Sequence, residues 1–184
     1  MSAFVSRAGS KLDHALTAFS LAVRGKICAD LGCSTGGFTD CLLQRGAAKV
    51  FAVDTGYGVL DWKLRKDPRV VVMERTNAMH VRLPEPVELV TIDVGWTRQR
   101  NILPSARRLL ASGGSVVTLV KPHYEADPYL LRKGILPEQA VDEIVQTVKA
   151  EAEQAGWIWV DSTRSPIRGA GGNVEVLAKL ALPA

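Results

Sequence analysis

Charged side chains directly follow several short apolar runs of the type that forms buried strands. Asp30 ends "ICAD", Asp54 ends "VFAVD", Asp93 ends "LVTID", and Lys121 follows "SVVTLV". A charge in such a position is costly to bury unless another group pairs with it. Ligands of open α/β sheets bind outside the carboxyl ends of the strands, so we expect these four side chains to line one site.

The glycine-rich turn "DLGCSTGGF" indicates what this site binds. Gly32, Gly36 and Gly37 follow a strand and open a helix, where glycine allows a tight turn and the close approach of a ligand. Their spacing differs from the G-x-G-x-x-G pattern of dinucleotide-binding proteins, so a pyrophosphate is poorly served. A nucleoside fits better, with Asp54 accepting hydrogen bonds from its ribose hydroxyls.

S-adenosylmethionine (SAM) is such a ligand, because it carries an adenosine, an ammonium and a sulfonium but no phosphate. Asp30, which precedes the glycines, would suit its positive charge. The alternative is that the turn only packs a helix against a strand. The residues predicted to bind SAM are Asp30, Gly32, Cys33, Ser34, Thr35, Gly36, Gly37, Phe38, Asp54, Asn77 and Asp93.

The alternation of two kinds of segment predicts the fold class. Short runs rich in Val, Ile and Leu are typical of parallel strands covered on both faces, and longer amphipathic segments lie between them. This alternation predicts a doubly wound α/β sheet. Gly46 and the pair Gly113-Gly114 are predicted to end helices. The predicted strands cover residues 26–32, 49–54, 69–74, 88–94 and 115–120, and the predicted helices cover residues 9–22, 38–45, 60–66, 101–110 and 137–155.

The last third of the chain changes in character. Strand-like runs at 156–167 and 173–182 are separated only by "RGAGG", with no helix between them. We therefore expect a hairpin, which makes one strand antiparallel at or near a sheet edge. The predicted fold is a mostly parallel seven-stranded sheet with one antiparallel strand from a C-terminal hairpin, in a single domain over residues 1–184.

Composition limits the class of protein. A chain of 184 residues with 47% hydrophobic and 23% charged residues is typical of one globular domain. No apolar run approaches the roughly 18–20 residues of a membrane span, and the amino terminus lacks the features of a secretory signal. Three cysteines cannot all pair, which favours a reduced, cytoplasmic protein with Cys28 and Cys41 in the core.

The charged and titratable residues give two further indications. The net charge of +4 permits an anionic partner such as nucleic acid. His14, His80 and His123 lack the spacing of a metal site, and we predict structural or surface roles for them and no metal.

Several motifs together resemble one known family. "SRAGSKL", "DLGCSTGGFTDCLLQRGA", "IDVGW", "VKPHYE" and "GNVEVL" occur in the order found in the FtsJ-like methyltransferases, and they are most similar to the branch that includes the TlyA hemolysin-like ribosomal RNA methyltransferases. The resemblance implies a Rossmann-like, SAM-dependent fold and methyl transfer to a ribose 2′-hydroxyl of RNA, most simply ribosomal RNA. It also implies a catalytic group of Lys11, Asp93, Lys121 and Glu175.

The chemistry of methyl transfer explains why these residue types are wanted. The reaction is an in-line displacement, and the acceptor oxygen must be aimed at the methyl carbon and freed of its proton. A ribose hydroxyl is a weak nucleophile, so a base or a nearby cation must favour its alkoxide character. The resemblance gives this role to Lys121, with Asp93 orienting it and Lys11 and Glu175 fixing the ribose and balancing charge.

The sequence also departs from the family. TlyA-like proteins usually carry an amino-terminal S4 RNA-binding module, whereas this sequence starts at the methyltransferase region, so we expect a helper protein or oligomerisation to assist in RNA binding. "GW" followed by "TRQRN" stands where a Ser-Phe pair and an Ile-Ser-Leu-like stretch are expected. The basic residues expected on the face of Lys121, as contacts to RNA, are Arg7, Arg98, Arg100, Arg164 and Arg168.

Other functions remain open on the sequence alone. A SAM-dependent methyltransferase that acts on a small molecule or a protein requires a narrow acceptor cleft without basic residues. A non-catalytic SAM- or RNA-binding module requires a disrupted catalytic group. Single residues also have simpler alternatives. Lys121 could extend to solvent from the strand end, Lys11 could belong only to the polar face of an amphipathic helix, and Glu175 could only face the edge of the sheet. Tyr124 and Glu125 either shape the acceptor pocket or cap a loop.

Overall fold

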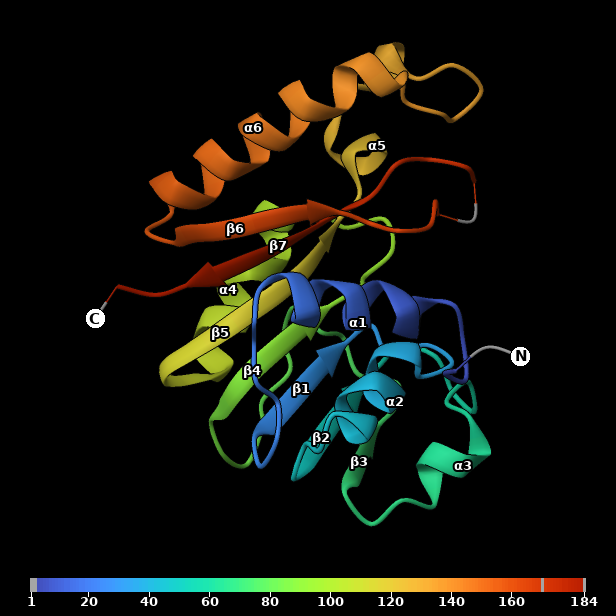
Figure 1. Cartoon of the computed structure of the whole chain (residues 1–184), viewed down its shortest axis with the longest axis vertical. Helices are drawn as coiled ribbons and strands as arrows, with labels where there is room; N and C mark the ends of the chain where they lie inside the picture. The colour runs from blue at the N-terminus through green and yellow to red at the C-terminus, as the bar shows by residue number, and fades with distance from the viewer. Residues whose placement is uncertain (1–2, 170, 184) are drawn as a thin grey trace.

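One seven-stranded sheet forms the centre of the protein, as Figure 1 shows for a computed structural model that describes residues 3–169 and 171–183. The strands are β1 (Ile27–Leu31), β2 (Lys49–Val53), β3 (Val70–Met73), β4 (Val87–Ile92), β5 (Leu110–Val120), β6 (Ile158–Arg164) and β7 (Val176–Ala181). The helices are α1 (Ala8–Ala18), α2 (Gly37–Gln44), α3 (Trp62–Arg65), α4 (Gln99–Leu109), α5 (Pro122–Glu125) and α6 (Glu138–Gln154), with a 3₁₀ turn, η1 (Pro128–Leu130).

The order of strands is β3-β2-β1-β4-β5-β7-β6. Strands β1 to β5 are parallel to one another, and β7 is antiparallel to both of its neighbours, β5 and β6. The predicted hairpin therefore exists, and the predicted seven-stranded, mostly parallel sheet is confirmed. Because the chain crosses from β1–β3 to β4 next to β1, the strand order reverses between β1 and β4, which is where such sheets bind ligands.

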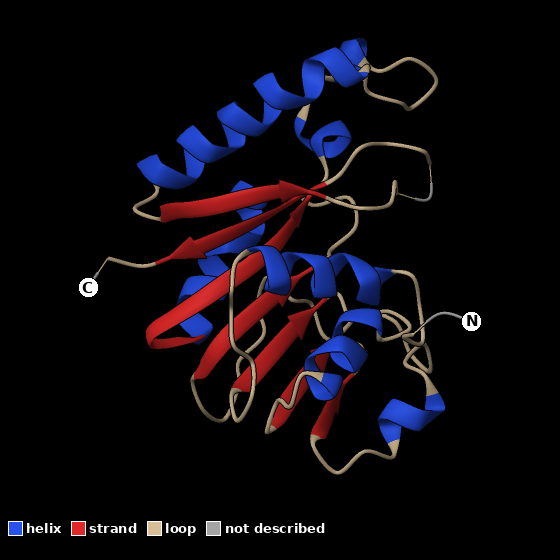
Figure 2. Ribbon diagram, in the orientation of Figure 1, coloured by secondary structure: helices blue, strands red, loops and turns tan. Residues whose placement is uncertain are grey.

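Helices cover both faces of the sheet, as Figure 2 shows. On one face, α1 and α2 bury a cluster that includes Leu16, Phe38 and Leu42. On the other face, α4 and α6 bury a cluster that includes Ile102 and Val141. The near-continuous apolar runs of β1, β4 and β5 follow from this arrangement, since their side chains are buried on both sides.

Predicted details of the core and of helix ends are mostly confirmed. Cys28 and Cys41 are fully buried, as expected. Helix α2 ends at Gln44, shortly before Gly46, which has a φ of 87°. None of the helices within the described ranges is long and apolar enough to cross a membrane.

Two predicted helix ends are wrong. Gly113 and Gly114 do not end a helix, because α4 stops at Leu109 and β5 begins at once with Leu110. The glycines lie inside β5, where the pairing with β4 is irregular: Val87 pairs with Leu110 but Leu89 pairs with Ser115, so β5 bulges between these pairs. Helix α1 ends at Ala18, earlier than predicted, because the chain turns through Ser20 with a φ of 48°.

Gly32 is the glycine on which the arrangement at the carboxyl end of β1 depends. It has a φ of 84°, and a Cβ atom there would lie 2.5 Å from the carbonyl oxygen of Asp93. The ends of β1 and β4 can approach this closely only where the side chain is a hydrogen atom.

We predict that Gly32→Ala destabilises the protein by more than Gly25→Ala. Gly25 also has a positive φ, of 77°, but nothing lies within 4 Å of the position of its Cβ. Gly25→Ala should therefore lower the free energy of unfolding by about 1–2 kcal/mol through backbone strain alone. Gly32→Ala should lower it by this amount and, in addition, by the cost of the clash with Asp93. Urea unfolding of both variants measures the difference; equal losses would contradict the close approach.

Candidate active site

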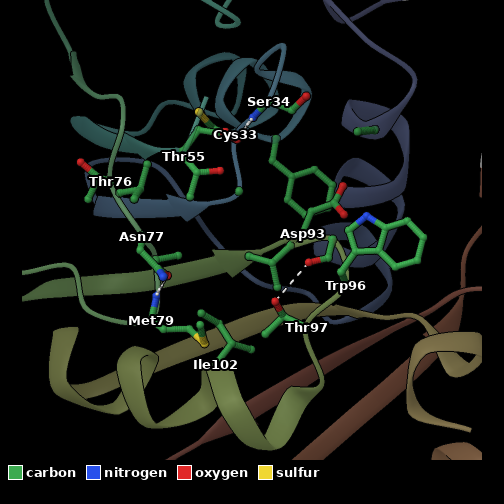
Figure 3. A pocket seen from close by; sticks show the side chains of 18 of the residues that line it. Cys33, Ser34, Thr55, Thr76, Asn77, Met79, Asp93, Trp96, Thr97 and Ile102 are labelled. Atoms are coloured by element: carbon green, nitrogen blue, oxygen red, sulfur yellow. Dashed lines mark hydrogen bonds between the residues drawn. The ribbon is translucent and has the colours of Figure 1, made fainter. Parts of the chain in front are cut away.

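A cavity of about 480 Å³ opens at the carboxyl ends of β1, β2, β4 and β5. Figure 3 shows Thr55, Thr76 and Asn77 on one side of it and Trp96 on the other. The cavity therefore lies at the predicted edge of the sheet. It is lined by Ser6, Ala8, Gly32, Cys33, Ser34, Phe38, Val53, Asp54, Thr55, Thr76, Asn77, Ala78, Met79, Asp93, Val94, Gly95, Trp96, Thr97, Ile102 and Lys121.

Asp54 holds the glycine-rich turn in place from the end of the next strand. Its carboxylate accepts the backbone N–H of Ser34 at 2.8 Å and that of Gly56 at 2.7 Å. Each carboxylate oxygen can accept more than one hydrogen bond, so Asp54 can also receive ribose hydroxyls. The predicted contact of Asp54 with a nucleoside is thus compatible with its position in the cavity wall.

Asp30 lies below the cavity and does not line it. It is fully buried, and its two oxygens accept the hydroxyls of Thr39 at 2.7 Å and Thr91 at 3.1 Å. Burial raises the pKa of Asp30 to about 7. Asp30 therefore joins α2 and β4 beneath the turn, and the direct contact with SAM predicted for it has no support from its position.

Of the other residues predicted to bind SAM, most line the cavity and three lie behind it in the glycine-rich turn. Those that line the cavity are Gly32, Cys33, Ser34, Phe38, Asp54, Asn77 and Asp93. Thr35, Gly36 and Gly37 do not line it. A Cβ at Gly36 would meet Leu64 of α3, and a Cβ at Gly37 would meet Ser6, so these glycines allow neighbouring segments to pack against the turn.

Lys121 points into the site at the end of β5. Its Nζ lies 2.6 Å from Oδ1 of Asp93 and donates to the carbonyl oxygen of Val94 at 3.1 Å. A lysine nitrogen has three positions besides its own carbon, so one position on Nζ remains for a ligand. Both side chains of the ion pair are mostly buried, which strengthens their attraction relative to water.

Lys11 and Glu175 form a second ion pair that does not line the cavity. Both residues are buried. Val120 and Val176 are the last pair of the β5–β7 ladder, so Lys121 and Glu175, the next residues outward, leave the sheet at the same end. A Cβ at Gly169 would lie 2.5 Å from Oε1 of Glu175, which shows that the loop before β7 lies against this carboxylate.

Trp96 is a site residue that the sequence did not predict. It is 89% exposed, lines the cavity and stacks on Tyr124, with ring centroids 5.1 Å apart. Ser6, Thr55, Thr76 and Met79 also line the cavity without having been predicted. Thr55 directly follows the predicted residue Asp54, and Thr76 directly precedes Asn77, a signal that could have identified them. Ser6 begins the motif "SRAGSKL", which was quoted for the family but not for the cavity.

The basic residues predicted to contact RNA are placed unevenly. Arg164 ends β6 at the same end of the sheet as Lys121, but it pairs with Glu138 and Asp142 of α6, and Arg168 also pairs with Glu138. Arg100 lies 4.0 Å from Glu151. The exposed Arg7 precedes α1, and Arg98 precedes α4, so these two lie next to cavity residues.

The histidines do not gather at one place. His14 shares a hydrogen bond of 3.1 Å with Thr163, and His123 packs against the ring of Tyr124 at 4.2 Å. No group of three or more metal-binding side chains exists among residues 3–169 and 171–183.

The fold and the cavity define a Rossmann-like α/β protein with a nucleoside-type ligand site at the reversal of strand order. Residues 4–181 match the FtsJ-like methyltransferase family. The chain belongs to this family, and the resemblance predicted from its motifs is confirmed.

Named relatives are similar over nearly the whole chain. The 16S/23S rRNA (cytidine-2′-O)-methyltransferase TlyA of Mycobacterium tuberculosis is 44% identical over 179 residues, which are 94% of this chain and 66% of TlyA. YqxC of Bacillus subtilis, named as a candidate rRNA methyltransferase, is 44% identical over 98% of this chain and 66% of its own length. The chain thus spans just under two thirds of the length of these relatives.

A solved structure shows the same fold. A protein of Streptococcus thermophilus, described as a hemolysin candidate, aligns with a TM-score of 0.94 at 41% sequence identity. The alignment covers 98% of this chain and 67% of that protein. The Rossmann-like architecture predicted from the resemblance is therefore confirmed.

We predict that Asp54→Ala weakens the binding of S-adenosylhomocysteine by about tenfold or more, since a hydrogen bond to a charged group contributes about 1.5–3 kcal/mol. Asp61→Ala is the matched control, because Asp61 also accepts a backbone N–H, that of Lys63 at 2.8 Å, but does not line the cavity. Calorimetry measures both affinities. An unchanged affinity in Asp54→Ala would show that Asp54 does not bind the ribose of the ligand.

We predict that Asp30 makes stability depend on pH. Its pKa is about 7 in the folded protein, compared with the ordinary value of 3.8, so the folded protein retains a proton that the unfolded chain has lost. The free energy of unfolding should therefore fall as pH rises from about 4 to about 8, by up to about 4 kcal/mol. Asp30→Asn should lack this decrease in urea unfolding at pH 5 and pH 8; an equal decrease in both proteins would contradict it.

Proposed function

We propose that this protein transfers a methyl group from SAM to a ribose 2′-hydroxyl of ribosomal RNA. One observation carries the proposal: the Nζ atom of Lys121 is held by Asp93 and by the carbonyl oxygen of Val94, with one position left open towards the cavity. Membership of the FtsJ-like methyltransferase family supports the reaction class.

The residues of the cavity fit SAM. The volume of about 480 Å³ suits a ligand of this size. Asp54 would hold the ribose, the exposed Asn77 and its neighbours would flank the adenine, and the backbone of Gly32–Ser34 would lie along the ligand. When bound, SAM supplies a methyl carbon that is electrophilic because it is attached to a sulfonium.

Lys121 has the geometry to act on the acceptor hydroxyl. Asp93 and Val94 fix the direction of the remaining position on Nζ, so this position can either take the hydroxyl proton or donate to the developing alkoxide. Orienting the acceptor in this way is a large part of the acceleration that an enzyme can supply. The Lys11–Glu175 pair lies at the same end of the sheet but is buried outside the cavity lining, so its proposed role is to balance charge there.

A stacked aromatic pair, of which Trp96 is exposed, supports RNA as the acceptor. Trp96 lines the cavity together with Lys121 and stacks on Tyr124 behind it, so a nucleobase attached to the reacting ribose would meet the ring of Trp96. Stacking of a base on an aromatic ring is the usual way in which proteins hold unpaired nucleotides. Ribosomal RNA is proposed because TlyA of Mycobacterium tuberculosis is named for it, and RNA as substrate agrees with the cytoplasmic location expected from the cysteines.

The recruitment of RNA is expected to need more than these residues. Arg7 and Arg98 remain as basic candidates beside the cavity, although Arg98 is near the carboxylate of Glu125, and Arg100, Arg164 and Arg168 lie within 4.0 Å of carboxylates. We therefore propose that residues 1–184 act as one methyltransferase domain and that another module, a helper protein or a second copy supplies further phosphate contacts.

The paired arginines also favour the second candidate function, methylation of a small molecule or a protein. Their charge is largely balanced by Glu138, Asp142 and Glu151, so the acceptor side is less positive than the sequence indicated. The two functions differ in the product that carries the methyl group, and one assay separates them.

We predict that the protein labels total ribosomal RNA with tritiated SAM and that Lys121→Ala lowers this turnover at least ~100-fold, the usual contribution of an acid–base group. SAM affinity should stay within about threefold, because the loss belongs to the chemical step. Lys26→Ala, which replaces a lysine before β1 at the other end of the sheet, is the control.

Nucleoside analysis should find a 2′-O-methylated product, and DNA of the same sequence should remain unlabelled since it lacks the hydroxyl. Label in protein or small molecules but not in RNA would replace the proposal with the second candidate. Near-normal turnover of Lys121→Ala would require another base.

A further inference from the structure

The turn after β5 and the loop after β4 meet at three points. At the start of the turn, Lys121 binds Asp93 and the carbonyl oxygen of Val94. In the middle, Tyr124 stacks on Trp96. At its end, the Oε1 atom of Glu125 accepts the backbone N–H of residue 99 at 2.8 Å. Residues 121–125 thus contact the start of the 93–98 loop through Lys121 and the first residue of α4 through Glu125.

Glu125 supplies the N-terminal cap that helix α4 lacks in its own sequence. The first N–H groups of a helix have no partner within it, and Arg98, at the cap position, makes no side-chain hydrogen bond there. The half-buried carboxylate of Glu125 fills this role from another element. A carboxylate suits the position, since a helix N-terminus carries a partial positive charge.

The loop between the fixed ends needs such support. Trp96 has a φ of 56°, which is unfavourable for any residue other than glycine, and its side chain is almost fully exposed. Beyond the loop, the buried side chain of Gln99 accepts the hydroxyl of Thr118 at 2.7 Å, which ties the start of α4 to β5. Without the cap, the loop would keep its contacts with Lys121 and Tyr124 but would lose the carboxylate that binds the first N–H of α4.

We propose that Glu125 is a positioning residue for methyl transfer. By holding the end of α5 on the start of α4, it keeps the Lys121 nitrogen and the Trp96 ring in one arrangement towards the acceptor nucleotide. The inference deepens the proposed function and rests on it for the reaction. Replacing a residue that only stabilised the fold would instead lower the affinity for SAM, the affinity for RNA and kcat alike.

The test compares Glu125→Ala with Glu125→Gln in the full chain. Glutamine retains an oxygen that can accept the N–H of residue 99, so Glu125→Gln should keep kcat within about threefold of the unchanged protein, whereas Glu125→Ala should lower kcat about 10–100-fold. The KM for SAM should change by less than kcat in either variant. Glu88→Ala is the matched control, because Glu88 also accepts a backbone N–H, that of Ile27 at 3.1 Å, at the opposite end of the sheet.

Hydrogen exchange provides a readout that does not require activity. Amides in residues 94–101 should exchange at least about tenfold faster in Glu125→Ala, and at nearly the unchanged rate in Glu125→Gln and Glu88→Ala. If the unchanged protein methylates no RNA, the proposed function fails, while faster exchange confined to this loop still supports the positioning contact.

Three results would overturn the inference. The first is normal kcat in Glu125→Ala. The second is a loss of SAM affinity as large as the loss of kcat, which would make Glu125 a general support of the fold. The third is unchanged exchange in residues 94–101.

Discussion

The ion pair between Asp93 and Lys121 is the interaction on which the rest of the site depends. The two residues end neighbouring parallel strands, β4 and β5, and each carries a charge that is mostly removed from water. Either charge alone would be costly in this position, so the two strand ends must come together for both to be tolerated. The pair also fixes the direction of the Lys121 nitrogen, which is what an in-line transfer requires.

The groups around this pair are arranged to keep it in place. Gly32 allows β1 to pass within contact distance of Asp93. The carbonyl oxygen of Val94 accepts a hydrogen bond from Lys121, and Glu125 binds the N–H of residue 99 at the far end of the loop that carries Trp96. Buried ion pairs contribute little net stability compared with apolar side chains. The presence of two such pairs, Lys11–Glu175 and Asp93–Lys121, at one edge of the sheet is therefore not explained by stability alone, which agrees with the proposed function.

The carboxylates that end the strands were only partly predictable from the sequence. The strand ends at Asp54, Asp93 and Lys121 were predicted correctly as one edge, because parallel strands place their carboxyl ends together. Asp30 ends a strand at the same edge but lies underneath the turn, bound to Thr39 and Thr91. Its sequence position resembles that of the others, and only the packing of α2 over β1 decides that it faces inward.

The basic residues illustrate the same difference. The charges of Arg164 and Arg168 are evident from the sequence, but their partner, Glu138, is 26 to 30 residues away. Trp96 likewise stacks on Tyr124 of α5, which follows a different strand of the sheet. Pairings between segments distant in sequence have no local periodicity to reveal them.

The sequence by itself determined the alternation of strands and helices, the hairpin that reverses β7, the family, and the residues at the strand ends. These features follow from local hydrophobic patterns and short motifs, which act within a few residues. The tertiary structure alone decided which polar groups face the cavity, which arginines are neutralised, and how Glu125 caps a helix formed by another segment. The physical reason is that burial and ion pairing depend on distances between elements, and these distances are set only when the helices pack on the sheet.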